Sequence, residues 1–219
     1  MLSLLSFILL ILCVICLLCC WSFSFSFNTK IYTIQEIPNF LTNEECELLI
    51  KLSEPNLIES KVYTHAEDDS IDTSHRKSEQ CWLKDNRHQV IENISKRVAS
   101  LTNTQKDLQE DLQVVKYTTG GFFNPHYDAC NGDKDFCKRM DGEKGPRYIT
   151  FLIYLNDDFT GGETVFPNIN KSVKPEKGKA VIFYNIDKDT KQILQDSFHG
   201  GNPVISGQKW ICNKWIKRG

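Results

Sequence analysis

The sequence predicts an α+β fold that is mainly β, with a jelly-roll (double-stranded β-helix) core and two supporting helices. From residue 112 onwards, short apolar or alternating runs are separated by turns rich in Gly, Asn and Asp, a pattern typical of a sandwich or barrel. Residues 42–52 and 85–101 instead carry apolar residues at helical spacing. A third feature, an apolar run at the start of the chain, predicts a membrane helix ahead of one domain at residues 28–219.

The composition is that of an ordinary globular domain. The 219 residues are 41% hydrophobic and 25% charged, with a formal net charge of -2. A chain of this size can bury a hydrophobic core without the help of disulfides or structural metal ions. No basic stripe stands out along the sequence, which argues against a nucleic-acid-binding protein.

Residues 1–27 are predicted to form an uncleaved signal anchor. The run from Leu2 to Trp21 contains no charged residue, and about 20 apolar residues suffice to cross a bilayer as a helix. This run exceeds the roughly 7–15 apolar residues of a cleaved signal peptide, and no small-residue cleavage site follows it. A cleaved signal peptide and a buried core helix are the alternatives. The expected location is a membrane, single-pass, with the domain in the lumen of the endoplasmic reticulum.

Five cysteines lie outside the apolar segment: Cys46, Cys81, Cys130, Cys137 and Cys212. A lumenal domain would permit disulfides, and Cys130 and Cys137 could close the polar loop that holds both. The pairing of the other three does not follow from the sequence. Because the count is odd, at least one thiol is expected to be free.

Two helices are expected in the first half of the chain, after a short strand at residues 30–34. Thr42 and Glu45 have the spacing of a capping box, and leucines follow at helical spacing. Residues 85–101 carry the apolar stripe of an amphipathic helix. The polar residues 53–80 between them predict a loop with at most short strands.

After residue 112 the apolar period changes to two, which predicts strands. The polar stretch 129–146 is expected to be a loop. The expected strands are residues 112–117, 123–128, 147–155, 163–166, 179–184 and 208–212.

His126 and Asp128 give the first indication of chemistry. Residues two apart on a strand point to the same face, so an imidazole and a carboxylate would stand side by side. A second histidine would complete the 2-His-1-carboxylate triad, which holds Fe(II) and leaves positions open for an oxidant and O2. His199, before the final strand, is the candidate. A structural histidine with satisfied hydrogen bonds is the alternative for His126.

Lys209 follows His199 by ten residues and stands between Gln208 and the apolar pair Trp210 and Ile211 on the final strand. A buried lysine is costly unless an anionic group satisfies it, and a co-substrate that carries a carboxylate would do so. A solvated lysine on an edge strand is the alternative.

These motifs together resemble those of prolyl 4-hydroxylases, a family of Fe(II)- and 2-oxoglutarate-dependent dioxygenases. The similarity covers essentially residues 33–217. Its segments are Thr42–Cys46, Arg76–Leu83, Tyr117–Asp128, Arg147–Asn156, Gly161–Phe166, and the closing His199, Lys209 and Trp215.

The resemblance implies roles for nine residues. The ligands of Fe(II) would be His126, Asp128 and His199. The residues that bind 2-oxoglutarate would be Lys209, on its distal carboxylate, with Tyr117 and Thr164. The residues that line the peptide groove would be Arg76, Arg147 and Trp215.

The resemblance also implies the reaction, in which peptidyl proline becomes 4-hydroxyproline while 2-oxoglutarate and O2 yield succinate and CO2. L-Ascorbate would rescue oxidised iron. One position departs from the family, because the residue three before the first iron ligand is commonly Tyr and is Phe123 here. The loop at 129–146 is also longer than in compact plant-type members.

Two other functions stay open. The same iron site would serve a dioxygenase that acts on peptidyl lysine or another side chain. A catalytically inactive, membrane-tethered jelly-roll binding module belongs to a different class, and the intact set of metal and co-substrate residues argues against it. Arg76 and Arg147 could be ordinary surface arginines, and Trp215 could be a core residue. The remaining histidines, His65, His75 and His88, are expected at the surface.

Overall fold

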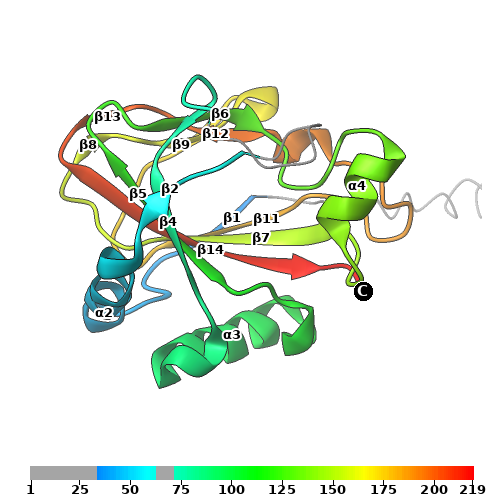
Figure 1. The fold of residues 1–219 in the computed structure, drawn as a ribbon, viewed down its shortest axis with the longest axis horizontal. Coiled ribbons are helices and arrows are strands. Elements are labelled where there is room, and N and C mark those ends of the chain that lie inside the picture. Colours follow the sequence, from blue (N-terminus) through cyan, green and yellow to red (C-terminus); the bar gives the residue numbers. More distant parts are fainter. Residues whose placement is uncertain (1–33, 63–71) are drawn as a thin grey trace, which may run out of the picture. The chain divides into compact units, whose positions relative to one another are not determined.

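Residues 34–62 and 72–219, which the computed structural model describes, form two antiparallel sheets packed as a sandwich (Figure 1). Across the larger sheet the strands are β1 (Gln35–Ile37), β11 (Ala180–Tyr184), β7 (Arg147–Tyr154), β14 (Gln208–Lys217), β5 (Leu112–Thr118), β4 (Glu79–Leu83) and β2 (Ile58–Glu59). Across the smaller sheet they are β10 (Lys171–Val173), β9 (Thr164–Phe166), β12 (His199–Gly201), β6 (Phe122–His126) and β3 (Arg76–Lys77). A separate pair is formed by β8 (Thr160–Gly161) and β13 (Val204–Ser206). The mainly β, jelly-roll prediction is confirmed.

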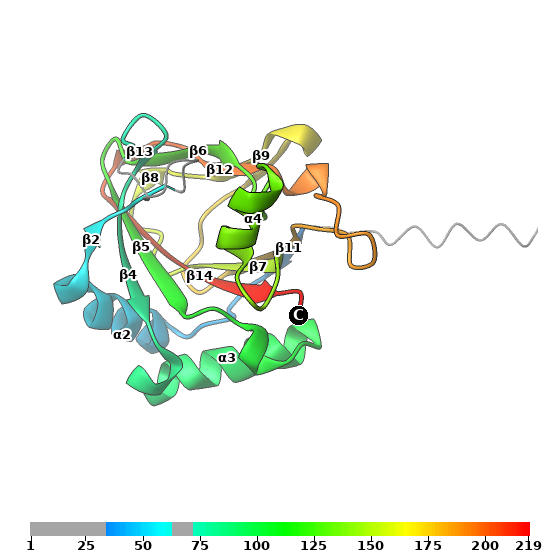
Figure 2. The same cartoon turned by 45° about the vertical axis from the view of Figure 1, so that its right-hand side comes forward.

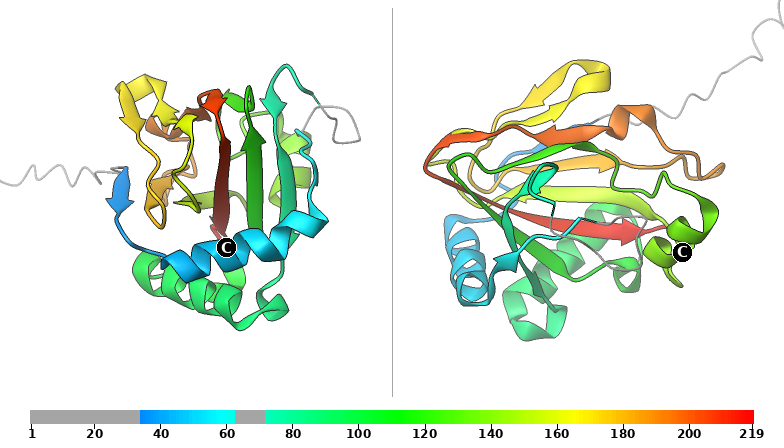
Figure 3. Two further views of the ribbon diagram at one scale, coloured as in Figure 1. Left: turned by 90° about the vertical axis from the view of Figure 1, so that its left-hand side faces the viewer. Right: turned by 45° about the horizontal axis from the view of Figure 1, so that its top comes forward.

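The helices α2 (Asn43–Ser53) and α3 (Gln89–Thr102) cover the outer face of the larger sheet (Figures 2 and 3). The predicted capping box is present at α2, because Glu45 N donates to Thr42 Oγ1 at 3.2 Å and Thr42 N donates to Glu45 Oε2 at 3.0 Å. Both helices pack their apolar faces on one core with the sheet, through buried residues such as Leu49 and Ile94.

Side chains of β14 alternate between two cores, one on each face of the larger sheet. Trp210, Cys212 and Ile216 lie in the core under the helices, whereas Ile211 lies in the second core, between the sheets. Residues of odd number on β14, Lys209 included, therefore face the space between the two sheets, because side chains alternate along a strand.

The second helix begins later than its apolar stripe predicts. Residues Asp85–Arg87 form a short 3-10 turn instead, and α3 begins at Gln89 with His88 as its N-cap. The Asp85 carboxylate accepts hydrogen bonds from Ser95 Oγ and Lys214 Nζ, both at 2.8 Å. These tertiary contacts hold the segment before the helix and could not be read from local spacing.

The expected polar loop at 129–146 contains a third helix, α4 (Lys134–Asp141), so the prediction of loop is wrong there. Asp133 caps it by accepting from Phe136 N at 2.9 Å. Phe136 and Met140, four residues apart, are its apolar face, which is too short to give a clear helical period. The sulfur atoms of Cys130, in the segment after Asp128, and Cys137, in α4, lie 2.07 Å apart, which is disulfide distance.

Two strands also differ from their predicted extent. β4 begins at Glu79, within the stretch 53–80 that was predicted to be loop with at most short strands, and continues beyond it to Leu83. β14 continues five residues beyond its predicted end, to Lys217. Both strands carry polar residues on the face toward the other sheet, which weakens the apolar pattern. Shorter 3-10 turns are Glu54–Asn56, Lys106–Leu108, Pro167–Ile169 and Gln195–Ser197.

The predicted signal anchor at residues 1–27 lies outside the described residues, as do residues 30–33 of the predicted first strand. Within 34–62 and 72–219, no helix has the length and apolar character to span a membrane.

Candidate active site

His126, Asp128 and His199 converge in the space between the sheets. His126 on β6 stands opposite His199 on β12 in an antiparallel pair, and Asp128 follows β6 by two residues. The Nε2 atom of His126 lies 3.5 Å from Asp128 Oδ1, and that of His199 lies 3.7 Å from Asp128 Oδ2. Ligand atoms of all three residues lie within 4.8 Å of one another. They could therefore hold one metal ion.

Both imidazoles are held with Nε2 toward this centre. His126 Nδ1 lies 2.8 Å from the carbonyl oxygen of Asn124, and His199 Nδ1 lies 2.8 Å from that of Ser197. A carbonyl oxygen can only accept, so each Nδ1 carries the hydrogen. Nε2 then keeps its lone pair, as metal-binding histidines require.

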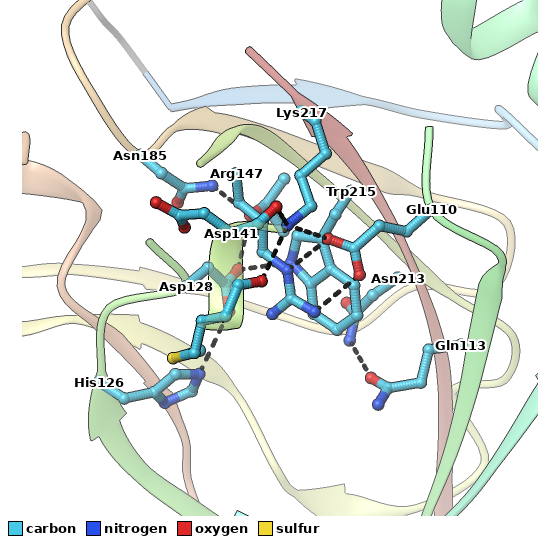
Figure 4. A network of polar contacts seen from close by, with 12 residues as sticks. Glu110, Gln113, His126, Asp128, Asp141, Arg147, Asn185, Asn213, Trp215 and Lys217 are labelled. Atoms are coloured by element: carbon cyan, nitrogen blue, oxygen red, sulfur yellow. Dashed lines mark hydrogen bonds and ion pairs between the residues drawn. The ribbon is translucent and has the colours of Figure 1, made fainter. Parts of the chain in front are cut away.

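Asp128 is held by a chain of donors (Figure 4). Its Oδ2 accepts from Thr150 Oγ1 at 2.5 Å and from Trp215 Nε1 at 2.9 Å. Asn185 Nδ2 in turn donates to Thr150 Oγ1 at 2.8 Å. The carboxylate is thus fixed by side chains from β7, β14 and the segment after β11.

The protonation states suit metal binding. Burial alone would raise the pKa of Asp128, but the His199 and His126 imidazoles beside it outweigh burial and keep that pKa well below its usual range. Burial lowers the pKa of His199 to about 4, although Asp128 opposes the shift. At neutral pH the site therefore presents a carboxylate and a neutral buried imidazole.

A glycine permits the close approach of β12 to β6. A Cβ atom at Gly200 would lie 2.9 Å from Pro125 N and 3.0 Å from Phe123 O. Such contacts are shorter than van der Waals contact allows, so only glycine fits there without displacing the strands that carry the two histidines.

Lys209 lies at the inner end of the same space, on β14, and only 2% of its surface is exposed. Its Nζ atom lies 5.2 Å from the centre of the Tyr117 ring and 5.8 Å from that of Tyr154. Tyr154 donates a hydrogen bond of 2.7 Å to Thr164 Oγ1. Burial lowers the pKa of Lys209 to about 8, against the opposing influence of Glu163.

The surroundings of this lysine leave room for an anion. Within the described parts of the chain, no carboxylate lies within ion-pair distance of Lys209 Nζ. Gly201 faces it, and a Cβ atom there would lie 3.6 Å from Nζ. The lysine is therefore a buried cation beside open space, which an anionic ligand would stabilise.

One cavity of about 790 Å³ joins these groups. All nine residues singled out from the sequence line it: Arg76, Tyr117, His126, Asp128, Arg147, Thr164, His199, Lys209 and Trp215. A cavity of this size can hold a small acid and part of a peptide.

Arg147 and Trp215 form one unit of the cavity wall (Figure 4). The Arg147 guanidinium lies 3.6 Å from the centre of the Trp215 ring and donates to both carboxylate oxygens of Glu110, at 2.7 and 2.8 Å. Burial would raise the pKa of Glu110, but Arg147 and Lys217 outweigh burial and lower it. Arg147 is thus paired within the protein, and its contact with a substrate stays a prediction.

Arg76 is buried in the opposite wall. Its Nε donates to Ser78 Oγ at 2.8 Å, and its guanidinium lies 4.7 Å from the centre of the Phe123 ring. That ring stacks on His126 with 3.7 Å between centroids. Arg76 is therefore not an ordinary surface arginine, and whether it contacts a peptide stays a prediction.

Several polar residues that line the cavity or support its lining residues were not identified from the sequence. Thr150 and Asn185 support Asp128, Glu110 holds Arg147, and Gln113 and Asn213 form part of the cavity floor. A signal was present for three of them, since Thr150, Gln113 and Asn213 lie within strands among buried residues and therefore need polar partners.

The prediction that three histidines lie at the surface is confirmed for the two that the structure describes. His75 and His88 are exposed, and His65 lies outside the described residues.

Comparison with known proteins identifies relatives that are similar in sequence and in fold. Residues 112–217 match the sequence profile of the 2OG-Fe(II) oxygenase superfamily. "Probable prolyl 4-hydroxylase 3" of Arabidopsis thaliana is 36% identical over 201 residues, which is 83% of this chain and 68% of the relative.

Two solved structures have a similar fold. The viral collagen prolyl hydroxylase of Paramecium Bursaria Chlorella virus-1, in its 2OG complex, is similar at a TM-score of 0.70 and 31% identity, covering 87% of this chain and 98% of that one. A prolyl hydroxylase from Trichoplax adhaerens, in complex with a peptide fragment of hypoxia inducible factor, has a TM-score of 0.63 at 20% identity, over 86% and 84% of the chains. The second likeness concerns the fold alone.

Proposed function

The chain belongs to the prolyl 4-hydroxylase family of Fe(II)- and 2-oxoglutarate-dependent oxygenases, and we propose that it hydroxylates peptidyl proline in the cavity between its sheets. It is a 2-oxoglutarate-dependent dioxygenase, as its relatives are. The observation that carries the assignment of this site is the shared cavity, in which a 2-His-1-carboxylate set lies together with a buried lysine that has no carboxylate partner among residues 34–62 and 72–219.

His126, Asp128 and His199 are proposed to hold Fe(II). Two imidazole nitrogens and one carboxylate oxygen are a donor set suited to Fe(II), and they leave positions open for other ligands. The fixed Nδ1 hydrogen bonds support this role, because they keep both Nε2 atoms available. When bound, Fe(II) and 2-oxoglutarate supply the oxidation that inserts one oxygen atom of O2 into a C–H bond, with succinate and CO2 as co-products.

Lys209 is proposed to bind the distal carboxylate of 2-oxoglutarate. A charge-assisted hydrogen bond would satisfy its buried ammonium, while Tyr117 and the hydroxyl of Thr164 lie near enough to line the same pocket. Because the lysine is enclosed by Tyr117 and Tyr154, the interaction is shielded from water and gains strength.

The peptide is proposed to enter past Arg76, Arg147 and Trp215. Trp215 fixes Asp128 through its indole N–H and is itself covered by Arg147. A substrate lying on this wall would exclude water from the metal and present its proline to the open side of the centre. Phe123, in place of the family's common Tyr, offers no hydroxyl to a peptide at this wall.

The test is incubation of the protein with Fe(II), 2-oxoglutarate and a panel of proline-rich and lysine-containing peptides, followed by mass spectrometry. We expect one added oxygen on proline, none with His126→Ala, and succinate formed in equal amount. Oxygen on lysine alone would favour the alternative substrate. Iron binding without any turnover of 2-oxoglutarate would favour the inactive binding module.

Other features complete the proposal. L-Ascorbate is proposed to restore oxidised iron, and residues 1–27 to anchor the domain in the endoplasmic reticulum membrane. The proximity of Cys130 and Cys137 supports a disulfide there, which suits a lumenal domain.

A further inference from the structure

Two segments of the chain have the pattern Asn-x-Ser, which is the acceptor pattern for N-linked oligosaccharides. They are Asn93–Ser95 and Asn170–Ser172. The pattern is short and common, so the local structure has to distinguish a modified asparagine from a chance match. The first segment lies within helix α3, whereas the second begins in the turn between β9 and β10.

In the segment Asn93–Ser95, both polar side chains already have partners in the fold. Asn93 Oδ1 accepts a hydrogen bond of 2.9 Å from Gln89 Nε2, one helical turn earlier. Ser95 is fully buried, and its hydroxyl donates to Asp85 Oδ1 at 2.8 Å. These contacts stabilise α3 and the segment before it, so they explain both residues without any modification.

The segment Asn170–Ser172 lies at the surface. Phe166 and Lys171 pair at the ends of β9 and β10, and the residues between them are all exposed. Asn170 is the last of these, and its backbone N–H donates to the carbonyl oxygen of Pro167 at 3.2 Å. In both views of Figure 3 the yellow turn after β9 stands at the outer edge of the domain, away from α2 and α3.

The conformation of the turn explains Asn170 but not Ser172. Asn170 has φ 49° and ψ 40°, in the left-handed region that favours asparagine and glycine. Asn39 and Asn103 also lie in that region, yet neither is followed two residues later by Ser or Thr. Ser172 is exposed. Across residues 34–62 and 72–219, no protein group is hydrogen-bonded to its hydroxyl or to the carboxamide of Asn170.

We propose that Asn170 is a site of N-linked glycosylation. This inference goes beyond the proposed function and rests instead on the proposed lumenal location of the domain. The donor class is an oligosaccharide linked to a lipid diphosphate. A bond forms between C1 of the first sugar and Asn170 Nδ2, while the bond from C1 to the diphosphate oxygen breaks. The lipid diphosphate leaves with that oxygen, and Nδ2 releases one proton.

A glycan at this position is compatible with the candidate active site. Neither Asn170 nor Ser172 lines the cavity that holds the proposed metal ligands. The glycan would also protect the fold, because β10 is an edge strand of the smaller sheet. A bulky polar group at the start of an edge strand hinders pairing with another chain, and it would cover Ile169, which is 37% exposed.

The experiment uses the full chain, synthesised in a cell-free system with endoplasmic reticulum microsomes. Peptide N-glycosidase in ¹⁸O-water converts each glycosylated asparagine to labelled aspartate, which mass spectrometry locates, and protease protection reports whether the domain is lumenal. Ser172→Ala removes the pattern and leaves Asn170 in place. Asn170→Gly removes the acceptor and keeps the left-handed backbone. Ser172→Thr keeps the pattern, and Asn93→Gln is the control for the other segment.

We expect label at residue 170 in the wild type, in Ser172→Thr and in Asn93→Gln, and its complete loss in Ser172→Ala and Asn170→Gly. Protease-protected wild-type protein without label at residue 170 would refute the site, and so would a label that only Asn93→Gln removes. Complete digestion of the wild-type domain outside intact microsomes would refute the site and the lumenal location together. Peptide hydroxylation should be equal in the wild type and in Ser172→Ala, so a failure of the proposed function would be seen separately.

Discussion

Thr150 and Trp215 stand opposite each other on β7 and β14, and both donate hydrogen bonds to the same oxygen of Asp128. An ionised carboxylate oxygen has two lone pairs, so these donors occupy Oδ2 and leave Oδ1 available to the proposed metal ion. The orientation of the Asp128 carboxylate, a proposed metal ligand, is thus set by the pairing of two strands that carry neither histidine.

Replacement of Thr150 by Val should weaken metal binding without changing any metal ligand. The variant keeps the side-chain shape but removes the hydroxyl that links Asn185 to Asp128. Loss of such supporting hydrogen bonds commonly lowers metal affinity about 10- to 100-fold. The Kd for Co(II), measured by titration of its visible absorbance, checks this expectation. Thr160→Val, on an exposed strand, is the control, and equal Kd values for both variants would contradict it.

Replacement of Lys209 by Met should selectively impair binding of 2-oxoglutarate. The methionine fills a similar volume but cannot pair with a carboxylate. We expect the Kd for 2-oxoglutarate to rise about 30-fold or more, whereas the Kd for Co(II) should change little. Isothermal titration without O2 measures both. Lys177→Met, whose lysine makes only a surface ion pair with Glu47, serves as control. An unchanged affinity for 2-oxoglutarate in the Lys209→Met variant would show that Lys209 does not bind this acid.

The pH dependence of 2-oxoglutarate binding should reflect the protonation state of Lys209. Burial lowers its pKa to about 8 in the free protein, so nearly all of the lysine is charged near pH 7, half is charged at pH 8, and the charge is lost as the pH rises further. The Kd should be constant near pH 7 and rise about tenfold for each pH unit above 8. Lys209→Arg stays charged throughout, so its Kd should be independent of pH in this range. A flat profile for the wild type would show that another group binds the acid.

Replacement of Glu110 by Gln should destabilise the fold through Arg147. Glu110 and Arg147 have 19% and 13% exposed side chains, so the change leaves a largely buried guanidinium without its carboxylate. Breaking a buried pair in this way costs about 3–5 kcal/mol. Urea unfolding should show this loss, whereas Glu47→Gln, which breaks an exposed pair, should cost less than about 1 kcal/mol. Similar losses of unfolding free energy in both variants would mean that the Glu110–Arg147 pair stabilises the fold no more than an exposed ion pair does.

The sequence alone determined the fold class and singled out the residues that we propose as metal ligands. Alternating apolar residues predicted strands because the pleat has a period of two, and the capping box at Thr42 predicted the start of α2 because both groups lie within one turn. The set of His126, Asp128, His199 and Lys209 could be named because each is a polar or charged residue in a strand or strand-end setting that calls for a partner.

Only the tertiary structure decided how these residues are supported. The register between β7 and β14 brings Thr150 and Trp215 onto one carboxylate, and the register between β6 and β12 sets His126 opposite His199. Neither register is encoded by local spacing, because each depends on which strands pair and at what offset. The helix α4 was also missed because its formation depends on tertiary contacts. Its apolar face is too short to be recognised in the sequence, and it is defined only by packing against the cavity.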